Sequence, residues 1–237
     1  MGGIMDLTGE PDGPPEKPGV AYADLFTGLY GTIAVLAALR LRERTGEGQW
    51  IDLGLFDVQL AVLANQAANE LIGGVTPRRM GNTHPNIVPY QVFEAADGPL
   101  VIACGNDGQF ARLSEALGLA LHRDPRFRSN RDRVAHRETV VGALAARLAA
   151  MPRAEVLVAM AEGGVPAGPI NSVAEAFAEP QAVARGAVQE FAGSRAPRSP
   201  MRLTTAAVGA DLPPPRLDEH GPAIRAALAA GAPWPGR

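Results

Sequence analysis

Apolar residues recur every three or four positions from residue 24 to residue 44, a spacing that predicts one long helix. The apolar positions of this pattern are Leu25, Leu29, Ile33, Leu36 and Leu39. Small residues such as Gly31 and Ala34 stand between them and suit close packing against another element. Asp24, at the start of the pattern, is predicted to cap the helix N-terminus.

A β-like segment and a second helical pattern follow. Residues 45–48 (TGEG) end the first helix, because glycine readily adopts the backbone conformation found after a helix C-terminus. Residues 49–53 (QWIDL) predict a short strand, and residues 56–71 predict a helix. The order helix, strand, helix predicts an α/β layer whose sheet needs further strands. The proline- and glycine-rich residues 7–19 predict a loop.

The most informative stretch contains two β-like runs, residues 90–93 and 100–104, joined by the turn signal Asp97-Gly98-Pro99. The loop GNDGQ, residues 105–109, comes next and precedes a helical pattern. A strand that ends in such a loop exposes backbone N–H groups that can hold an anion. The pattern also fits a tight turn with Asn106 or Asp107 as helix N-cap, and turn chemistry alone favours that interpretation.

A polar loop broken by proline, residues 81–89, precedes the first β-like run and brings Asn82, His84 and Asn86 together. Loops that collect such groups often carry function. His84 is interpreted first as a solvent-facing or hydrogen-bonding residue, with a catalytic role as the alternative. Cys104, at the end of an apolar run, is interpreted as a small buried residue and not as a nucleophile.

Helical patterns predominate after residue 109. Helices are predicted at residues 110–119, 138–150, 153–162, a short segment ending near 177, and 218–230, and strands at 188–191 and 201–205. The charged run at residues 122–137 is predicted to be solvated surface with Phe127 as its aromatic anchor. Residues 163–171 (GGVPAGPIN) break the helical pattern, and Asn171 or Ser172 is predicted to cap the next helix.

Composition is that of an ordinary globular protein, with 46% hydrophobic and 20% charged residues among 237. A net charge of -3 gives no basic surface, so we expect no nucleic-acid partner. The single cysteine cannot form an internal disulfide, which favours a reducing, cytoplasmic location. No cluster of cysteine and histidine suggests a metal site, and we expect none.

Membrane and nucleotide signals are absent from the sequence. No uninterrupted run of about 18 apolar residues occurs, so we expect no membrane partner. Residues 1–6 lack the basic and apolar regions of a signal peptide. The phosphate-binding motifs G-x-G-x-x-G and G-x-x-x-x-G-K-[ST] do not occur.

Six further segments occur in order over nearly the whole chain. They are MGGIMDLTGEPDGPPEKPGVAYADLFTGLYG, RERTGEGQWIDLGLFD, MGNTHPNIVPYQVFEAADGPLVIACGNDGQF, DPRF, GGVPAGPIN and PPPRLDEH. Together they resemble the family III CoA-transferases, which move coenzyme A between an acyl-CoA and a free carboxylate. The third segment is most similar to members that act on small dicarboxylates.

The resemblance implies an α/β fold of two parts. Residues 1–75 would be the C-terminal part of a Rossmann-like large domain with its long helix, and residues 76–180 a small α/β domain. Residues 181–237 would be the return segment and C-terminal tail. Family members form interlocked rings, so the resemblance implies an intertwined homodimer if the protein is complete.

The resemblance also assigns a candidate site. The glycine loop that closes over the acyl-CoA in the family matches Gly105, Asn106, Asp107, Gly108 and Gln109. Residues near the coenzyme would be Thr27, Gly28, Leu29, Tyr30 and His84. The thioester of coenzyme A would be a substrate beside the carboxylic acid, and no cofactor would be bound permanently.

The family's nucleophile is an aspartate a few residues upstream of the Met-Gly-Gly sequence, which here stands at residues 1–3. The resemblance therefore implies that the catalytic aspartate and an N-terminal half lie upstream of Met1, and that this chain alone is inactive. With the aspartate, the reaction would pass through an aspartyl-CoA thioester. Asp6 is not expected to replace it, because catalysis tolerates little displacement of a reacting group.

Two other interpretations stay open. An acyl-CoA racemase or isomerase of the same fold would need an acid and a base on either side of the α-carbon. A non-catalytic chain would associate with a partner protein instead. An exposed apolar face on the helix at residues 25–41 would indicate such association.

Overall fold

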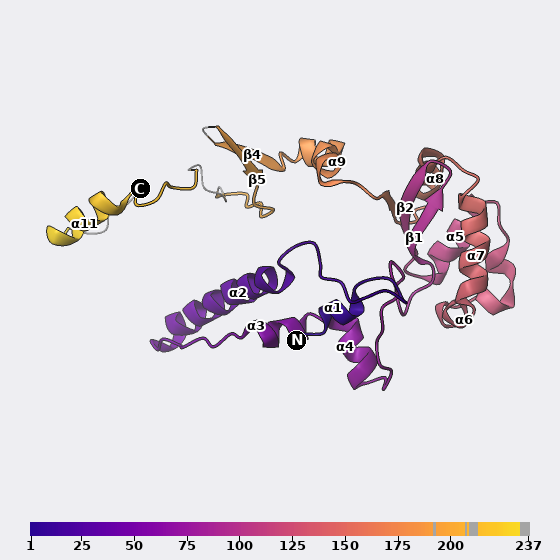
Figure 1. The fold of residues 1–237 in the computed structure, drawn as a ribbon, viewed down its shortest axis with the longest axis horizontal. Coiled ribbons are helices and arrows are strands. Elements are labelled where there is room, and N and C mark those ends of the chain that lie inside the picture. The colour runs from indigo at the N-terminus through magenta and orange to yellow at the C-terminus, as the bar shows by residue number, and fades with distance from the viewer. Residues whose placement is uncertain (192, 207, 209–212, 233–237) are drawn as a thin grey trace. The chain divides into compact units, whose positions relative to one another are not determined.

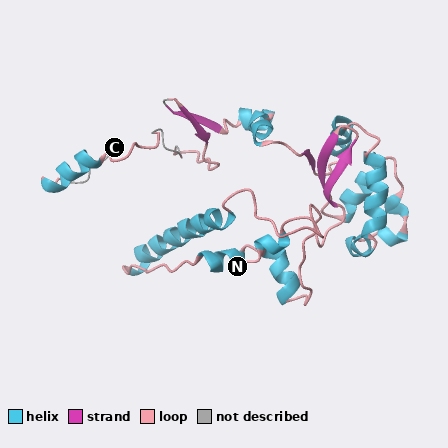
Figure 2. Ribbon diagram, viewed as in Figure 1, coloured by secondary structure: helices cyan, strands magenta, loops and turns pink. Residues whose placement is uncertain are grey.

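The computed structural model describes residues 1–191, 193–206, 208 and 213–232. The chain divides into two compact units, Met1–Ile170 and Asn171–Arg237 (Figure 1). Helices and strands are both present, which confirms the expected α/β class (Figure 2). The finer division after residues 75 and 180 stays a prediction.

The long helix expected in the first unit is α2, Tyr22–Thr45. Its N-cap is Ala21, which offers no side-chain hydrogen bond, so the cap expected at Asp24 is wrong. Asp24 lies in the first turn instead, where a carboxylate interacts favourably with the positive end of the helix dipole. Gly46 ends the helix with a φ of 77°, a conformation in which glycine avoids a Cβ clash.

Three shorter helices accompany α2, and they differ in part from the expectation. They are α1 (Ile4–Leu7), α3 (Leu55–Ala61) and α4 (Ala64–Leu71). A single helix was expected over residues 56–71, but Ala64 has a φ of 49°, in the left-handed region. A residue in that region cannot continue a right-handed helix, so the helical segment is interrupted there.

The strand expected at residues 49–53 is wrong. None of residues 1–89, all of which the structure describes, forms a strand. A strand persists only where a neighbouring strand accepts and donates its backbone hydrogen bonds, and these residues meet no such neighbour. Trp50, with 94% of its surface exposed, shows how open this segment is.

A three-stranded antiparallel sheet lies in the first unit, in the order β1-β2-β3. Its strands are β1 (Tyr90–Ala95), β2 (Gly98–Ala103) and β3 (Ala167–Pro169). The hairpin of β1 and β2 confirms the runs expected at residues 90–93 and 100–104. β3 was missed, because glycine and proline are rare in strands and the segment was interpreted only as a helix break.

Helices pack on this sheet to form the core of the first unit. They are α5 (Asp107–Ala116), α6 (Asn130–Ala135), α7 (Arg137–Leu148) and α8 (Arg153–Glu162), with 3₁₀ turns at Leu121–Arg123 and Pro125–Phe127. α7 contacts β1, and α8 contacts β2 and β3. The fully or almost fully buried residues include Leu100, Ile102, Phe110, Leu113, Leu144, Leu148, Val156 and Met160. α5, α7 and α8 confirm the helices expected at residues 110–119, 138–150 and 153–162 within a few residues, whereas α6 was not expected.

The charged run at residues 122–137 is only partly the solvated surface that was expected. Phe127 is buried at 2% exposure, which confirms its role as an anchor. Arg133 is also buried, with no exposed surface, and this part of the expectation is wrong. A buried arginine is rare unless its charge and its donors find partners.

The second unit consists of short elements. They are α9 (Val173–Ala178), α10 (Pro180–Ala184), β4 (Val188–Phe191), β5 (Ser194–Pro197) and α11 (Gly221–Ala229). Ser172 caps α9 as expected. β4 confirms the strand expected at residues 188–191 and pairs antiparallel with β5. The strand expected at residues 201–205 is wrong, because these residues form no strand. Pairing with the nearer segment closes a shorter loop at a lower entropic cost.

α2 exposes apolar side chains along its whole length. None of its residues is buried, and Leu29, Ile33 and Leu36 are each about 60% exposed. By length and composition α2 is also apolar enough to cross a membrane. The sequence had been expected to contain no segment that meets this test. The same test is passed by core helices of globular proteins, so it is weak evidence for a membrane span.

Candidate functional site

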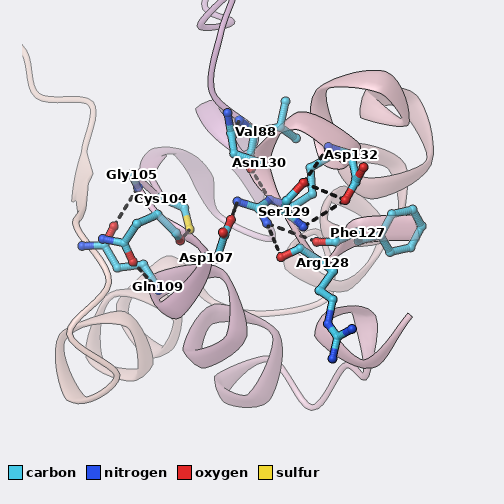
Figure 3. A network of polar contacts seen from close by, with 12 residues as sticks. Val88, Cys104, Gly105, Asp107, Gln109, Phe127, Arg128, Ser129, Asn130 and Asp132 are labelled. Carbon is cyan, nitrogen blue, oxygen red and sulfur yellow. Dashed lines mark hydrogen bonds and ion pairs between the residues drawn. The ribbon is translucent and has the colours of Figure 1, made fainter. Parts of the chain in front are cut away.

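The loop after β2 is closed by reciprocal hydrogen bonds at the start of α5 (Figure 3). The backbone N–H of Gln109 donates to Oδ1 of Asn106 at 2.9 Å, and the N–H of Gly105 donates to Oε1 of Gln109 at 2.7 Å. Asn106 is therefore the helix N-cap, as one interpretation of the sequence expected. The loop is exposed at Gly105, Asn106, Asp107 and Gly108, and partly buried at Gln109.

Two backbone donors of this loop point to anion binding. Within the described part of the chain, the N–H groups of Asp107 and Gly108 have no acceptor, as is usual for the first turn of a helix. Exposed N–H groups at a helix N-terminus attract negative charge. The geometry therefore suits an oxyanion or carboxylate, although the carboxylate of Asp107 itself stands in the same turn.

Arg133, from α6, reaches three backbone carbonyls from inside the core. Its Nε donates to the carbonyl of Val88 at 2.8 Å, and its Nη1 donates to that of Phe127 at 3.1 Å and that of Arg128 at 3.5 Å. Its guanidinium also lies 4.4 Å from the ring centroid of Phe110, a cation–π contact. These contacts place a buried positive charge directly beneath the start of α5.

Asp107 supplies the countercharge from the candidate loop. Nη2 of Arg133 lies 2.8 Å from Oδ1 of Asp107, while the Asp107 side chain is 56% exposed. The same Nη2 makes no hydrogen bond of good geometry within the described residues, so the contact is an ion pair at close range. The loop is thus tied to the core through one carboxylate.

His84 lies in a polar loop before β1 and stacks on Tyr90, with ring centroids 5.1 Å apart. Its Nδ1 accepts the N–H of Asn86 at 3.1 Å, which leaves the proton of the neutral ring on Nε2. Partial burial, and then the nearby charge of Arg137, lower the pKa of His84, so the ring is neutral near pH 7. A neutral ring with an available Nε2 proton is a hydrogen-bond donor toward a ligand.

Asparagine side chains hold this polar loop against its neighbours. Asn86 exchanges hydrogen bonds with Asn69 of α4, at 3.1 and 3.3 Å. Asn130 of α6 donates to the carbonyl of Asn86 at 2.8 Å. It also accepts the N–H of Val88 at 3.1 Å (Figure 3). The carbonyl of Pro89 in turn accepts the N–H of Cys104, so the polar loop borders the segment that leads to the glycine loop.

The residues expected near the coenzyme on α2 form a separate group. The hydroxyl of Thr27 donates to the carbonyl of Ala23 at 2.7 Å, while Gly28, Leu29 and Tyr30 are exposed. Among the described residues, no hydrogen bond, ion pair or ring contact joins them to residues 105–109. Their proximity to coenzyme A stays a prediction.

A cavity of about 600 Å³ lies beside the first residues of the chain. Its lining includes Gly2, Gly3, Phe56 and Gln59. A Cβ on Gly2 would meet Cγ of Gln59, so only glycine fits this approach. Gln59 is 6% exposed and its Nε2 has no acceptor within the described residues. No residue that the sequence singled out for binding lines this cavity.

Cys104 is fully buried at the end of β2, as expected. Burial raises the pKa of its thiol to about 11, so the thiol is protonated at neutral pH and is a poor nucleophile. Within the described ranges, no group of three histidine, cysteine or acidic side chains is placed to hold a metal ion.

Sequence reasoning missed Arg133, Asn130 and Gln59. The pattern Ser129-x-x-Asp132 is a capping signature and would have found the start of α6. It does not reveal which arginine of the run points inward, because no periodicity separates Arg131 from Arg133 in so short a helix. Only the contacts of Arg133 with Phe110 and Asp107 of α5 show this.

The sheet, its covering helices and the glycine loop define an α/β fold known from solved structures. A CAIB/BAIF family protein from Brucella suis matches with a TM-score of 0.77 and 53% identity, covering 96% of this chain and 60% of that one. A hypothetical protein from Mycobacterium tuberculosis matches with a TM-score of 0.82 at 24% identity, covering 94% and 60% of the two chains. The second likeness shows the fold alone.

The family described as CoA-transferase family III matches residues 1–221, so the chain belongs to that family, and the resemblance found in the sequence is confirmed. The succinate–glutarate CoA-transferase of Agrobacterium fabrum is 47% identical, with 96% of this chain and 58% of the relative covered. The acetyl-CoA:oxalate CoA-transferase of Acetobacter aceti is 40% identical, with 97% and 60% covered. The chain therefore spans little more than half the length of these curated relatives.

Proposed function

We propose that the protein moves coenzyme A between an acyl-CoA and a dicarboxylic acid. The observation that carries the proposal is membership of CoA-transferase family III over residues 1–221. The names of the relatives support the acid class, since those above act on succinate, glutarate and oxalate. The Mus musculus relative, 41% identical over 93% of this chain and 52% of its own length, is a succinyl-CoA:glutarate CoA-transferase.

The reaction is nucleophilic catalysis by a carboxylate. An aspartate attacks the thioester carbonyl and forms a mixed anhydride, releasing the CoA thiolate. The thiolate then attacks the enzyme-side carbonyl of the anhydride, which gives an aspartyl-CoA thioester and frees the donor acid. The acceptor carboxylate repeats both steps in reverse. We assign this aspartate to a position outside residues 1–237, as the family resemblance implies.

Residues 105–109 supply the donors for this chemistry. Each attack passes through an oxyanion, which preorganised backbone N–H groups stabilise. The free N–H groups of Asp107 and Gly108 stand at a helix N-terminus and suit this role. The two glycines of the loop, Gly105 and Gly108, permit the motion by which it covers the reacting groups and excludes water.

The test is transfer from succinyl-CoA to glutarate and to oxalate, with each CoA ester measured by mass spectrometry. The full-length protein is expected to form glutaryl-CoA or oxalyl-CoA and to release succinate in equal amount. The 237-residue chain alone is expected to form neither. Racemisation of a 2-methylacyl-CoA without any transfer would contradict the proposal, as would inactivity of the full-length protein under conditions where the Agrobacterium relative is active.

Association with another chain is the second function that the structure favours. We propose that α2 is covered by protein in the assembled molecule, because a helix that is apolar on all sides is normally buried. The family resemblance suggests an intertwined homodimer as the assembly, and we propose a cytoplasmic location for it. Sedimentation of the full-length protein tests this proposal, and a full-length monomer would contradict the dimer.

A further inference from the structure

Arg133 is the one charged side chain with no exposed surface among the described residues. Its donors reach backbone carbonyls at Val88, Phe127 and Arg128, which belong to the segment before β1 and to the turn before α6. These carbonyls carry only partial charge. The full positive charge therefore still needs an anionic partner, because burying an uncompensated charge is costly.

Asp107 is the only carboxylate that pairs with Arg133 in the described part of the chain. The two ends of this ion pair differ in freedom, since the Arg133 side chain is enclosed by protein and the Asp107 side chain is about half exposed. Any movement of the loop that withdraws Asp107 leaves the buried guanidinium without its countercharge. The ion pair therefore favours one position of the loop over all others.

We propose that Arg133 is a positioning residue, which holds the Gly105–Gln109 loop in its working position through Asp107 and ties it to the polar loop at Val88. It acts on the reaction through Asp107 and does not touch the substrate. The effect of Arg133 on catalysis rests on the proposed function. Its effect on the position of the loop does not. A loop held in place covers the anhydride and the thioester intermediates and keeps water from them.

The variant Asp107→Asn tests the structural part, because it removes the countercharge and keeps the size of the side chain. Amide hydrogen exchange at Gly105, Gln109 and Phe110 of the full-length protein, whose N–H groups have acceptors, is expected to become at least about tenfold faster. The matched control is Asp218→Asn, since Asp218 is 57% exposed and pairs with the exposed Arg225 at 2.8 Å. The control is expected to leave exchange at residues 105–110 unchanged. Unchanged exchange in Asp107→Asn would overturn the proposal, whatever the activity.

The catalytic part has its own readout, the ratio of acyl-CoA hydrolysis to CoA transfer. In Asp107→Asn the ratio is expected to rise about tenfold, because the less restrained loop admits water to the intermediates. A variant that only lost stability would lose both rates together and keep their ratio. An unchanged ratio with faster exchange would overturn the catalytic role. Absence of transfer in the unmodified full-length protein would refute the proposed function and leave the exchange result standing.

Arg133→Lys adds a test of the pairing itself. Lysine keeps the positive charge but has one nitrogen, which cannot reach the carbonyls and Asp107 together. If the proposal is right, Asp107→Asn accelerates loop exchange much less in the Arg133→Lys background than in the unmodified protein. Such non-additivity is the mark of two interacting residues in a double-mutant cycle. Equal effects in both backgrounds would overturn it. If Arg133→Lys does not fold, the Asp107→Asn comparison decides alone.

Discussion

At the scale of single residues, Cys104 shows how burial suppresses the chemistry of a side chain. The thiol lies at the end of β2 next to the candidate loop, and its burial agrees with the interpretation of Cys104 from the sequence as a small buried residue. Its pKa is raised to about 11, chiefly by burial. Because alkylating reagents attack the thiolate, the folded protein presents very little of the reactive form at moderate pH.

We therefore expect iodoacetamide at about pH 8.5 to modify Cys104 at least about tenfold more slowly in the folded protein than in urea. Mass spectrometry follows the reaction without ambiguity, since Cys104 is the only cysteine. The raised pKa also implies that stability is full below the unfolded pKa, near about 8.5, and is lost as the pH rises toward about 11. Equal alkylation rates in the two states would contradict the burial of the thiol.

His84 titrates in the opposite sense. Its pKa is lowered in the folded protein by burial and by Arg137, so the unfolded chain takes up a proton more readily. Stability is therefore present above the unfolded pKa, near about 6.5, and falls as the pH drops below that value. The melting temperature of His84→Gln should fall less between about pH 7.5 and about pH 5.5 than that of the unmodified protein.

The matched control for this prediction is His220→Gln, at an exposed position in the second unit. Both variants are compared by the change in melting temperature with pH and not by its absolute value, because His84→Gln also loses the stacking on Tyr90. An identical pH dependence in His84→Gln and the unmodified protein would show that His84 takes up its proton equally well in both states.

At the scale of elements, a capping box fixes the start of α6, the helix that carries Arg133. The hydroxyl of Ser129 accepts the N–H of Asp132, and the Asp132 carboxylate accepts the N–H of Ser129. Hydrogen bonding from Ser129 also lowers the pKa of Asp132. α6 has six residues, too few to be stable by propensity alone, so it depends on such terminal contacts.

Ser129→Ala is expected to cost about 1 kcal/mol of unfolding free energy, the usual loss for a capping residue. It should also loosen the candidate loop, measured as faster amide exchange at residues 105–110, because α6 carries Arg133. Ser172→Ala is the matched control, since Ser172 forms the same kind of capping box at α9 of the second unit. Equal amide exchange at residues 105–110 in the two variants would mean that the capping of α6 does not stabilise the loop.

Helices and strands were predictable where a short stretch of sequence carries the whole pattern. The hairpin of β1 and β2 follows from alternating apolar residues around a turn, and α7 and α8 follow from helical spacing. The strand expected at residues 49–53 does not form because no other strand offers it hydrogen-bond partners. β3 was missed because glycine and proline are rare in strands, and it forms because β2 offers partners. Such pairing depends on residues distant in the sequence.

At the scale of the whole molecule, the exposed apolar surface of α2 governs behaviour in solution. Exposed apolar patches of this kind favour association. Ile33→Lys combined with Leu36→Lys should reduce self-association of the 237-residue chain, measured by sedimentation and by binding of an apolar dye. Both side chains are more than 60% exposed, so the lysines need not be buried in the chain by itself.

The control for this surface is Thr32→Lys, which adds a charge at an exposed position next to Ile33 and removes no large apolar side chain. It should leave dye binding close to that of the unmodified chain. In the full-length protein the double variant should instead weaken assembly, because the charges would then lie in a buried interface. A monomeric 237-residue chain that binds no dye would contradict the role given to α2.

The candidate site was predictable in part. The glycine loop could be located from sequence because a strand, a Gly-x-x-Gly spacing and a helix cap are all short-range signals, and the structure places Asn106 at the helix cap. Its support from Arg133 and Asn130 was not predictable, since both come from a charged run that resembles solvated surface. The cavity beside Gly2 and Gln59 also joins residues far apart in the chain.

The sequence by itself determined the family, the helices with regular spacing, the β1–β2 hairpin and the glycine loop, because each depends on residue types within a short window. Only the tertiary structure decided which polar groups are buried, which strands find partners and which helix face lacks a cover. Burial and strand pairing depend on contacts between distant segments, and the free energy of a charge such as that of Arg133 is set by those contacts.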